Sequence, residues 1–299
     1  DTNQVLFQSL MISLGHKTGR TLFFLLSKRV PFRDLMDYTS SLESGEQATA
    51  MQALMLHVAN LMTPDKESRY SPDEETLEYI NRLNRHWMHY SGYFSDRVMP
   101  LTRRWFAGIR PVNFATRRIA GITRLITRIA PDGRLTEHIM SPFRMACDRK
   151  LTSKELRAFL LDINRLLMVT DDPYWSHRFN FKSKKSSRSM TLIGRDTASS
   201  LLFNAVLPMM ILLARMEKNP NLEDFLWKCA HSLPPLPENM ITTFMKKRLF
   251  GSAENASAYF FNERRQQALF TVFHDCCNSN EHSCETCLFY SAANRNDDV

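Results

Sequence analysis

NFATRRIAGITRLITRIA, residues 113–130, is the stretch of sequence that decides the fold. Its apolar residues recur at intervals of three and four, the spacing that places side chains on one face of an α-helix. That face consists of Ile119, Ile122, Leu125, Ile126 and Ile129. Asn113 precedes the first turn, and an asparagine side chain in that place commonly accepts a hydrogen bond from the turn. We therefore predict a helix that Asn113 caps.

The same spacing continues on both sides of this stretch and predicts helices almost throughout the chain. Gly15 should end the first helix, and Ser71 and Pro72 should begin the second, with Leu77 on its buried face. Pro208 should kink its helix, because proline leaves a backbone carbonyl unpaired. The predicted helices cover residues 5–14, 71–87, 113–130, 152–168, 196–216, 221–231, 238–249 and 262–276. The fold class is mainly α, a multi-helix globular domain.

Composition supports this fold class. The 299 residues are 43% hydrophobic and 23% charged, with only 9 Gly but 16 Met and 20 Phe, a balance that favours helices in a soluble domain. No shift in composition marks a boundary, so we expect a single helical domain over 1–299. The longest apolar run, 201–214, is shorter than the ~18 residues of a membrane span. The first residues resemble neither a signal peptide nor a methionine start, so we expect the C-terminal part of a longer, cytoplasmic protein.

Basic residues gather in two segments that lack acids. The net charge is +8, and Leu101–Ala130 holds seven arginines while Pro173–Arg195 holds six Lys or Arg residues. Such segments suit a polyanion, and we expect nucleic acid, with DNA favoured over RNA. The alternative is a solvated face balanced by the acidic helix at 73–79. The candidate binding residues are Arg110, Arg117, Arg118, Arg124, Arg178, Lys182, Lys184 and Lys185.

The segment YWSHRFNFKSKKSSRSMTLIG, residues 174–194 and here called the arm, interrupts the helical pattern. Its first half alternates aromatic and polar residues, and its second half is basic and rich in serine. We predict an extended insertion followed by a basic loop. Tyr174, Trp175, Phe179 and Phe181 could stack on bases. Alternation favours the other interpretation, in which these aromatic side chains pack into the core.

The chain carries four of its six cysteines in HDCCNSNEHSCETC, within a cysteine-rich tail at 274–290. Cys284 and Cys287 have the spacing of a metal knuckle, and Cys277 can supply a third thiolate. The fourth ligand could be His282, His274, Cys147 or Cys229, so zinc or an iron–sulfur cluster is the expected cofactor. Cys276 is expected to point into the core. The alternative is a set of thiols without metal, packed against the last helix.

Four segments in order resemble an uncharacterised bacterial family, the domain of unknown function 2851. They are RPVNFATRRIA (110–120), YWSHRFNF (174–181), LIGRDTASSLLFNAVLP (192–208) and QALFTVFHDCCNSNEHSCETC (267–287). Ala115 and Arg178 depart from the family's pattern. The resemblance implies a preceding region of restriction-endonuclease type that carries the catalytic carboxylates and a fourth cysteine.

Catalytic motifs are absent from this sequence. It contains no GxSxG elbow, phosphate-binding Walker loop, GxGxxG or HExxH. We therefore expect a helical accessory domain of a nuclease-like protein that binds nucleic acid through its basic segments, with any nuclease activity in the preceding region. The rival hypothesis is a helical protein–protein scaffold with a structural cysteine tail.

Overall fold

The computed structural model describes residues 1–62, 71–100, 110–251, 256, 259–277 and 287. The chain divides into two compact units, Asp1–Leu226 and Trp227–Val299, which we describe separately. No shift in composition at Leu226 marks this division in the sequence. The regular elements of the described residues are helices, so the prediction of a mainly α, multi-helix fold is confirmed.

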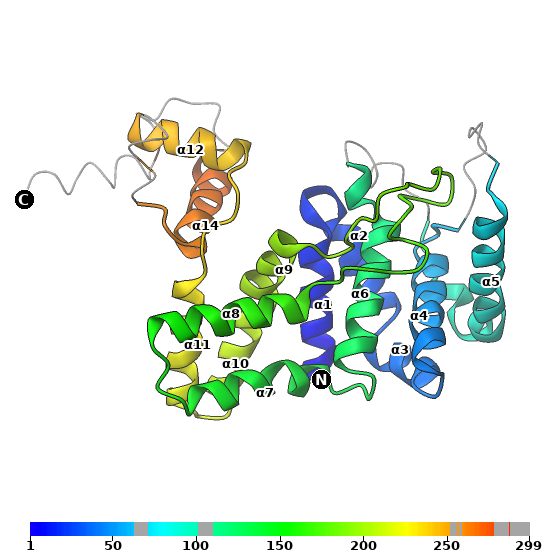
Figure 1. Ribbon diagram of the computed structural model, residues 1–299, viewed down its shortest axis with the longest axis horizontal. Helices are drawn as coiled ribbons and strands as arrows, with labels where there is room; N and C mark the ends of the chain where they lie inside the picture. Colours follow the sequence, from blue (N-terminus) through cyan, green and yellow to red (C-terminus); the bar gives the residue numbers. More distant parts are fainter. Residues whose placement is uncertain (63–70, 101–109, 252–255, 257–258, 278–286, 288–299) are drawn as a thin grey trace, which may run out of the picture. The chain divides into compact units, whose positions relative to one another are not determined.

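The first unit is a packed set of helices around α1 and α4 (Figure 1). Contacts between neighbours place α5, α4, α6 and α1 side by side in that order, and α1 also contacts α2, α3, α7 and α9. The helices are α1 (Thr2–Leu14), α2 (His16–Arg29), α3 (Phe32–Thr39), α4 (Ser44–Val58), α5 (Glu74–Phe94), α6 (Ala115–Ile129), α7 (Leu135–Cys147), α8 (Ser153–Leu167), α9 (Arg195–Leu201) and α10 (Leu207–Met216).

The central helix α1 ends where the sequence predicts. Gly15 is its C-cap, and a Cβ at this position would lie 2.7 Å from the backbone of Gly19 and Arg20. Only glycine therefore permits α2 to begin so close to the end of α1. Leu6, Phe7 and Leu10 of α1 are fully buried. The junction and the apolar face together make α1 the core element of this unit.

Helix α6 begins two residues after the predicted cap. Pro111 starts a short 3₁₀ turn, Pro111–Asn113, which holds Asn113, and Phe114 occupies the N-cap position of α6 without a side-chain hydrogen bond. The prediction that Asn113 caps the helix is therefore wrong. Its side chain instead accepts a hydrogen bond from the Arg118 guanidinium. All of α6 is buried except Arg124 and Arg128, so it is a core helix with polar residues in its interior face.

Helix α5 also begins later than predicted. The N-cap is Asp73, whose carboxylate accepts a hydrogen bond of 3.0 Å from the Thr76 amide, in place of Ser71 and Pro72. The buried face is turned relative to the predicted one, and Leu77 is exposed. The face that packs inward consists of Thr76, Tyr79, Leu83, Tyr90 and Phe94. Tyr79 takes this place because an aromatic cluster of the arm lies over it, as described below.

The apolar segment 195–216 is interrupted as predicted. Five residues, Leu202–Val206, form a π-helical turn between α9 and α10. Pro208 has no N–H to pair with the carbonyl four residues earlier, and the wider turn absorbs the missing bond. By length and composition Arg195–Met216 could cross a membrane, but 61% of its apolar window is buried inside the protein, as in the core helix of a soluble protein.

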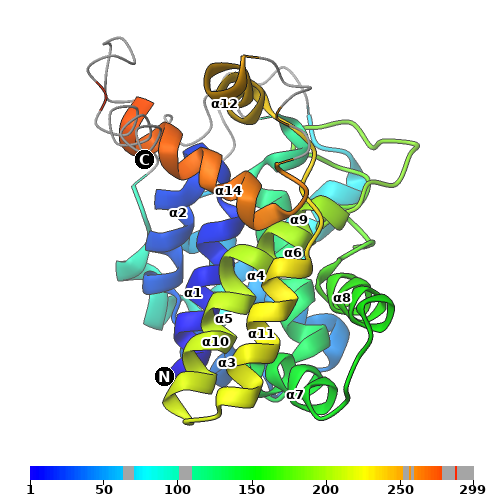
Figure 2. The same ribbon diagram turned by 90° about the vertical axis from the view of Figure 1, so that its left-hand side faces the viewer.

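The second unit begins at Trp227, inside α11 (Pro220–Ser232). Its other helices are α12 (Met240–Phe250), α14 (Glu263–Val272) and a π-helical turn at Phe273–Cys277. Asn239 caps α12 and Asn262 caps α14 through their side chains. Helices α12 and α14 pack against each other (Figures 1 and 2). Met245 and Leu269 are buried in these helices, and so are the charged residues Lys246 and Glu263.

Candidate nucleic-acid interface

The arm connects α8 to α9 and lies against α6 and the start of α5. At its base Val169 pairs with Ile193 in an isolated antiparallel bridge, with a Val169 N to Ile193 O distance of 3.0 Å. Further out, the Met190 amide donates to the Ser176 carbonyl at 2.8 Å. The Ser186 amide donates to the His177 carbonyl at 2.7 Å. The arm is thus a closed, irregular hairpin without a regular strand in the described residues.

Arg117 of α6 holds both sides of this hairpin. Its Nη1 donates to the carbonyls of Trp175 and Arg178, the latter at 2.9 Å. Its Nη2 donates to the carbonyls of Met190 and Thr191, at 3.3 and 3.0 Å. The side chain is only 1% exposed, and burial lowers the pKa of Arg117. A guanidinium so placed does not reach a phosphate at the surface, so its assignment to nucleic-acid binding does not fit this structure.

Arg118 of α6 binds the C-terminal end of the arm. Its guanidinium donates to the Leu192 carbonyl and the Thr197 hydroxyl, both at 3.4 Å, and to Asn113. It is 4% exposed, and burial, followed by the nearby charge of Arg117, lowers the pKa of Arg118 to about 10. Like Arg117, it is a structural side chain that ties α6 to the arm. Its burial likewise removes it from a surface interface.

Arg178 connects the arm to the start of α5. Its Nη2 lies 2.7 Å from Asp73 Oδ2 and 2.8 Å from Glu75 Oε2, and its Nη1 donates to the Ser183 carbonyl at 3.2 Å. The side chain is 1% exposed. The acidic first turn of α5 thus neutralises this arginine, which also faces the Tyr174 ring. Arg178 therefore orients the loop and is not available to a polyanion.

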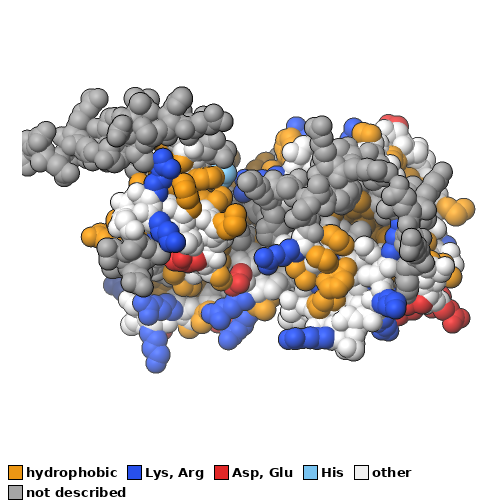
Figure 3. Space-filling view, turned by 90° about the horizontal axis from the view of Figure 1, so that it is seen from above, with side chains coloured by type: hydrophobic (Ala, Val, Ile, Leu, Met, Phe, Trp, Pro, Cys, Tyr) orange, Lys and Arg blue, Asp and Glu red, His pale blue; other side chains and the backbone are white. Residues whose placement is uncertain are grey.

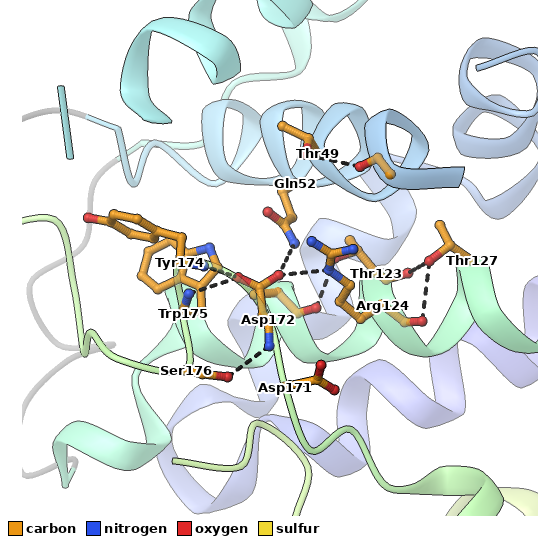
Figure 4. Close-up of polar contacts among 12 residues, drawn as sticks. Thr49, Gln52, Thr123, Arg124, Thr127, Asp171, Asp172, Tyr174, Trp175 and Ser176 are labelled. Carbon is orange, nitrogen blue, oxygen red and sulfur yellow. Dashed lines mark hydrogen bonds and ion pairs between the residues drawn. The ribbon is translucent and has the colours of Figure 1, made fainter. Parts of the chain in front are cut away.

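Arg124 pairs with Asp172, just before the arm (Figure 4). Asp172 Oδ2 accepts from Arg124 Nε at 2.7 Å and from Gln52 at 3.4 Å. Its Oδ1 accepts from the amides of Tyr174 and Trp175 at 3.0 and 2.7 Å. Four donors thus occupy the two oxygens of this buried carboxylate, so its role is to hold the backbone of the arm. The pair anchors the start of the arm to α4 and α6.

The aromatic side chains at the start of the arm form a buried cluster. The Tyr174 ring stacks on Tyr79 of α5 with centroids 4.1 Å apart, and Trp175 Nε1 donates to the Tyr79 hydroxyl at 2.9 Å. Trp175 is fully buried, and Phe181 contacts the same three rings. The interpretation that these aromatic residues pack into the core is therefore confirmed for Tyr174 and Trp175, which are not placed to stack on bases. Phe179 and Phe181 are half-buried.

Exposed cations remain at the tip of the arm, in a segment that we call the basic loop, residues 182–188. Lys184 and Arg188 are exposed, and no ion pair within the described part of the chain involves them. Lys185 is also exposed but pairs with Glu75 at 2.9 Å. The Lys182 amide donates to Asn180 Oδ1 at 2.9 Å and its side chain is partly buried. Arg110, before α6, is exposed as well.

Arg188 was missed in the sequence-based choice of binding residues. Its place in a serine-rich loop is the sequence signal that could have identified it, because the serine hydroxyls bond to the loop backbone. Ser186 Oγ donates to the Arg188 carbonyl at 2.9 Å and accepts from the Arg188 amide at 3.1 Å. Ser183 Oγ accepts from the Phe179 amide at 2.9 Å. These short-range hydrogen bonds hold the backbone of the loop in one conformation.

A cleft of about 400 Å³ lies on another side of the arm, against α4 and α5. Its charged lining is mainly acidic, and the only basic side chains in it are Arg82 and Arg124. The acids are Glu43, Glu46, Glu75, Glu78 and Asp172. Such a lining repels phosphates, so this cleft is not the polyanion site.

The cysteine tail is described only in part. Cys284 and His282 lie outside the described residues, so the predicted convergence with Cys277 and Cys287 stays a prediction. Burial, followed by the charge of the neighbouring Cys287 thiol, raises the pKa of Cys276. Cys276 thus lies beside Cys287, and the expectation that it points into the core is wrong. Within the described part of the chain, no three His, Cys, Asp or Glu side chains are placed to hold a metal ion.

Comparison with known proteins identifies the family of this chain. No curated protein and no solved structure matches the chain. A family model matches residues 1–239, which include the arm, α6 and the whole of the first unit and end before the cysteine tail. The resemblance seen in the sequence is thereby confirmed over most of its length. The chain belongs to the family described as "Protein of unknown function (DUF2851)".

Proposed function

We propose that this chain binds nucleic acid through the basic loop, as a non-catalytic accessory part of a nuclease-like protein. The observation that carries the proposal is the contrast between the two kinds of basic residue. Arg117, Arg118 and Arg178 are buried and fix the backbone of the arm. Lys184 and Arg188 are exposed on the loop so fixed. A loop held in one conformation loses little entropy when a polyanion binds to it.

Electrostatics favour the same surface. Asp73 and Glu75, the acids of α5 that the arm contacts, are already paired with Arg178 and Lys185. Lys184, Arg188 and Arg110 therefore add positive charge that no acid of the described chain balances. The net charge of +8 supports attraction of a polyanion over longer distances. We favour a bacterial setting on the resemblance to the family, and we keep the expectations of DNA over RNA and of a cytoplasmic location from the sequence.

The dependence of affinity on salt tests the proposal. Each lost phosphate contact should reduce the slope of log affinity against log salt by roughly 0.7–0.9. Lys184→Ala combined with Arg188→Ala should therefore reduce the slope by about 1.5 and weaken binding. Lys154→Ala combined with Arg157→Ala removes the same charge from exposed positions on α8 and is the matched control. Equal slopes for the two double variants would refute a role for the loop.

A metal centre is a separate part of the proposal. Cys284 and Cys287 have knuckle spacing, Cys277 is the third thiolate, and His282 is the candidate fourth ligand. Zinc or an iron–sulfur cluster would fold the tail by joining these ligands. Metal and sulfide analysis of the protein purified without oxygen tests this part. Zinc, or iron together with sulfide, that Cys284→Ser removes supports it, and metal-free protein contradicts it.

One observation favours the rival scaffold function. Leu77 and Met88 are exposed on the same face of α5. Positions eleven residues apart coincide on an α-helix, and Asn81, Asn84 and Arg85 lie between these two, so they are separate apolar side chains that a partner protein could contact. If the protein has no salt-dependent affinity for nucleic acid, the protein–protein scaffold function is favoured.

A further inference from the structure

A second cleft, of about 680 Å³, lies in the C-terminal unit at the start of α14. All of its lining residues belong to that unit, and none of them is acidic. They are His231, Phe261, Asn262, Arg264, Arg265 and Ala268. The fixed charge of this cleft is therefore that of two arginines, the opposite of the acidic cleft beside the arm.

Arg264 faces a histidine in place of an acid. Its Nη1 lies within hydrogen-bond distance of His231 Nε2. A guanidinium only donates hydrogen bonds, so the His231 ring nitrogen is the acceptor in this contact. The His231 ring stacks on Trp227, with centroids 6.0 Å apart and an interplanar angle of 26°. The positive charge of Arg264 thus stays uncompensated in an aromatic setting.

Arg265 lies beside an exposed aromatic ring. Its guanidinium carbon is 4.4 Å from the centroid of Phe261, and its Nη1 donates to the Tyr259 carbonyl at 3.1 Å. Phe261 is 59% exposed, and Tyr259 is exposed too. The guanidinium thus lies over one face of this exposed ring, and a planar group can stack on the other face.

Glu263, which lies between Phe261 and Arg264 in the sequence, does not reduce the positive charge of this cleft. Glu263 is the only acid in α14, and its side chain is fully buried. Its backbone N–H donates to the Leu233 carbonyl at 3.1 Å. Burial raises the pKa of Glu263 to about 8, so the group is uncharged at neutral pH. Figure 3 shows Lys and Arg side chains directly beside hydrophobic ones around α12, in the same unit.

We propose that this cleft binds single-stranded nucleic acid, with a base stacked on Phe261 and the adjoining phosphates on Arg264 and Arg265. The inference rests on the proposed function and names the form of nucleic acid, because the bases of a duplex are stacked on one another and leave no face for Phe261. Aromatic and arginine side chains also concentrate in protein–protein interfaces, which makes a protein partner the competing outcome.

The experiment measures the affinity of the full chain for a fluorescein-labelled dT12 strand and for a 12-base-pair duplex, by fluorescence anisotropy. Phe261→Ala should weaken single-strand binding by roughly 5- to 100-fold, the range expected for one stacked base, and leave duplex binding unchanged. Phe244→Ala is the matched control, because Phe244 of α12 is also exposed and has Arg248 5.6 Å from its ring centroid, yet does not line the cleft. Phe261→Tyr keeps the ring and should keep the affinity.

Each outcome decides between the two proposals. Loss of single-strand affinity in Phe261→Ala, with normal binding by Phe244→Ala, supports the cleft whatever the basic-loop variant does. Loss in the basic-loop variant alone supports the proposed function and overturns the cleft. Equal losses in Phe261→Ala and Phe244→Ala, or preference for the duplex, overturn it too. No binding of either nucleic acid overturns both and points to a protein partner.

Discussion

The anchor of the arm, Asp172, offers the sharpest test of how this unit is held together. Asp172→Asn keeps an oxygen for the amides of Tyr174 and Trp175, since both bonds go to Oδ1. It replaces Oδ2 with an amide NH₂, which then faces the donors of Arg124 and Gln52. The variant thus removes the charged half of the anchor and retains the neutral half.

The magnitude follows from these contacts. A hydrogen bond to a charged group contributes about 1.5–3 kcal/mol, and removal of one member of a buried pair costs about 3–5 kcal/mol. Arg124 keeps 26% of its side chain in water, which lowers the cost of leaving it unpaired. We expect Asp172→Asn to lower the free energy of unfolding by about 2–3 kcal/mol. Asp172→Ala, which also removes the acceptor of both amides, should cost about 4 kcal/mol or more.

Urea unfolding followed by circular dichroism measures the difference. With a slope of about 2–3 kcal/mol per M, Asp172→Asn should shift the midpoint of the first unit down by about 1 M. Asp171→Asn is the control, because Asp171 is exposed and, among the described residues, its carboxylate accepts from Thr170 Oγ1 alone. It should stay within about 0.5 kcal/mol of the wild type. The account of the anchor fails if Asp172→Asn matches Asp171→Asn, or if Asp172→Ala costs no more than Asp172→Asn.

Two further predictions concern packing and pH. Gly121→Val should destabilise the first unit by about 1–3 kcal/mol in the same assay, because even a Cβ at Gly121 would lie 3.0 Å from Ile193 Cγ1. A valine variant as stable as the wild type would contradict the close approach of α6 and the arm. For Glu263, the pKa of about 8 in the folded chain lies above the ordinary 4.5, so its contribution to stability is full below pH 4.5 and is lost as pH rises through 8. The unfolding midpoint of the C-terminal unit should fall between pH 5 and 8, and Glu263→Gln should flatten this dependence; an equal fall in the variant would assign it to another group.

The arginines of 110–128 explain why the candidate interface could be predicted only in part. An acid-free run of arginine predicts a polyanion surface when the side chains reach water. Here Arg117 and Arg118 lie on the buried side of α6, where carbonyls of an irregular segment about sixty to seventy residues later need donors. A guanidinium supplies several donors at once and meets that need. No local pattern in the sequence distinguishes the two cases.

The sequence by itself determined the elements whose cause is local. Apolar spacing predicted most of the helices, but the predicted ranges leave out α2, α3, α4 and α7. Gly15 ended the first helix, Pro208 disturbed its helix, and alternation favoured the burial seen for Tyr174 and Trp175. Those properties depend on neighbours within a turn or two along the chain. Only the tertiary structure decided which cations are exposed, that Asn113 orients Arg118, and that Asp73 and Glu75 neutralise Arg178. Charge and hydrogen bonding act through space, so the role of a basic side chain is set by acceptors that can lie a hundred residues away.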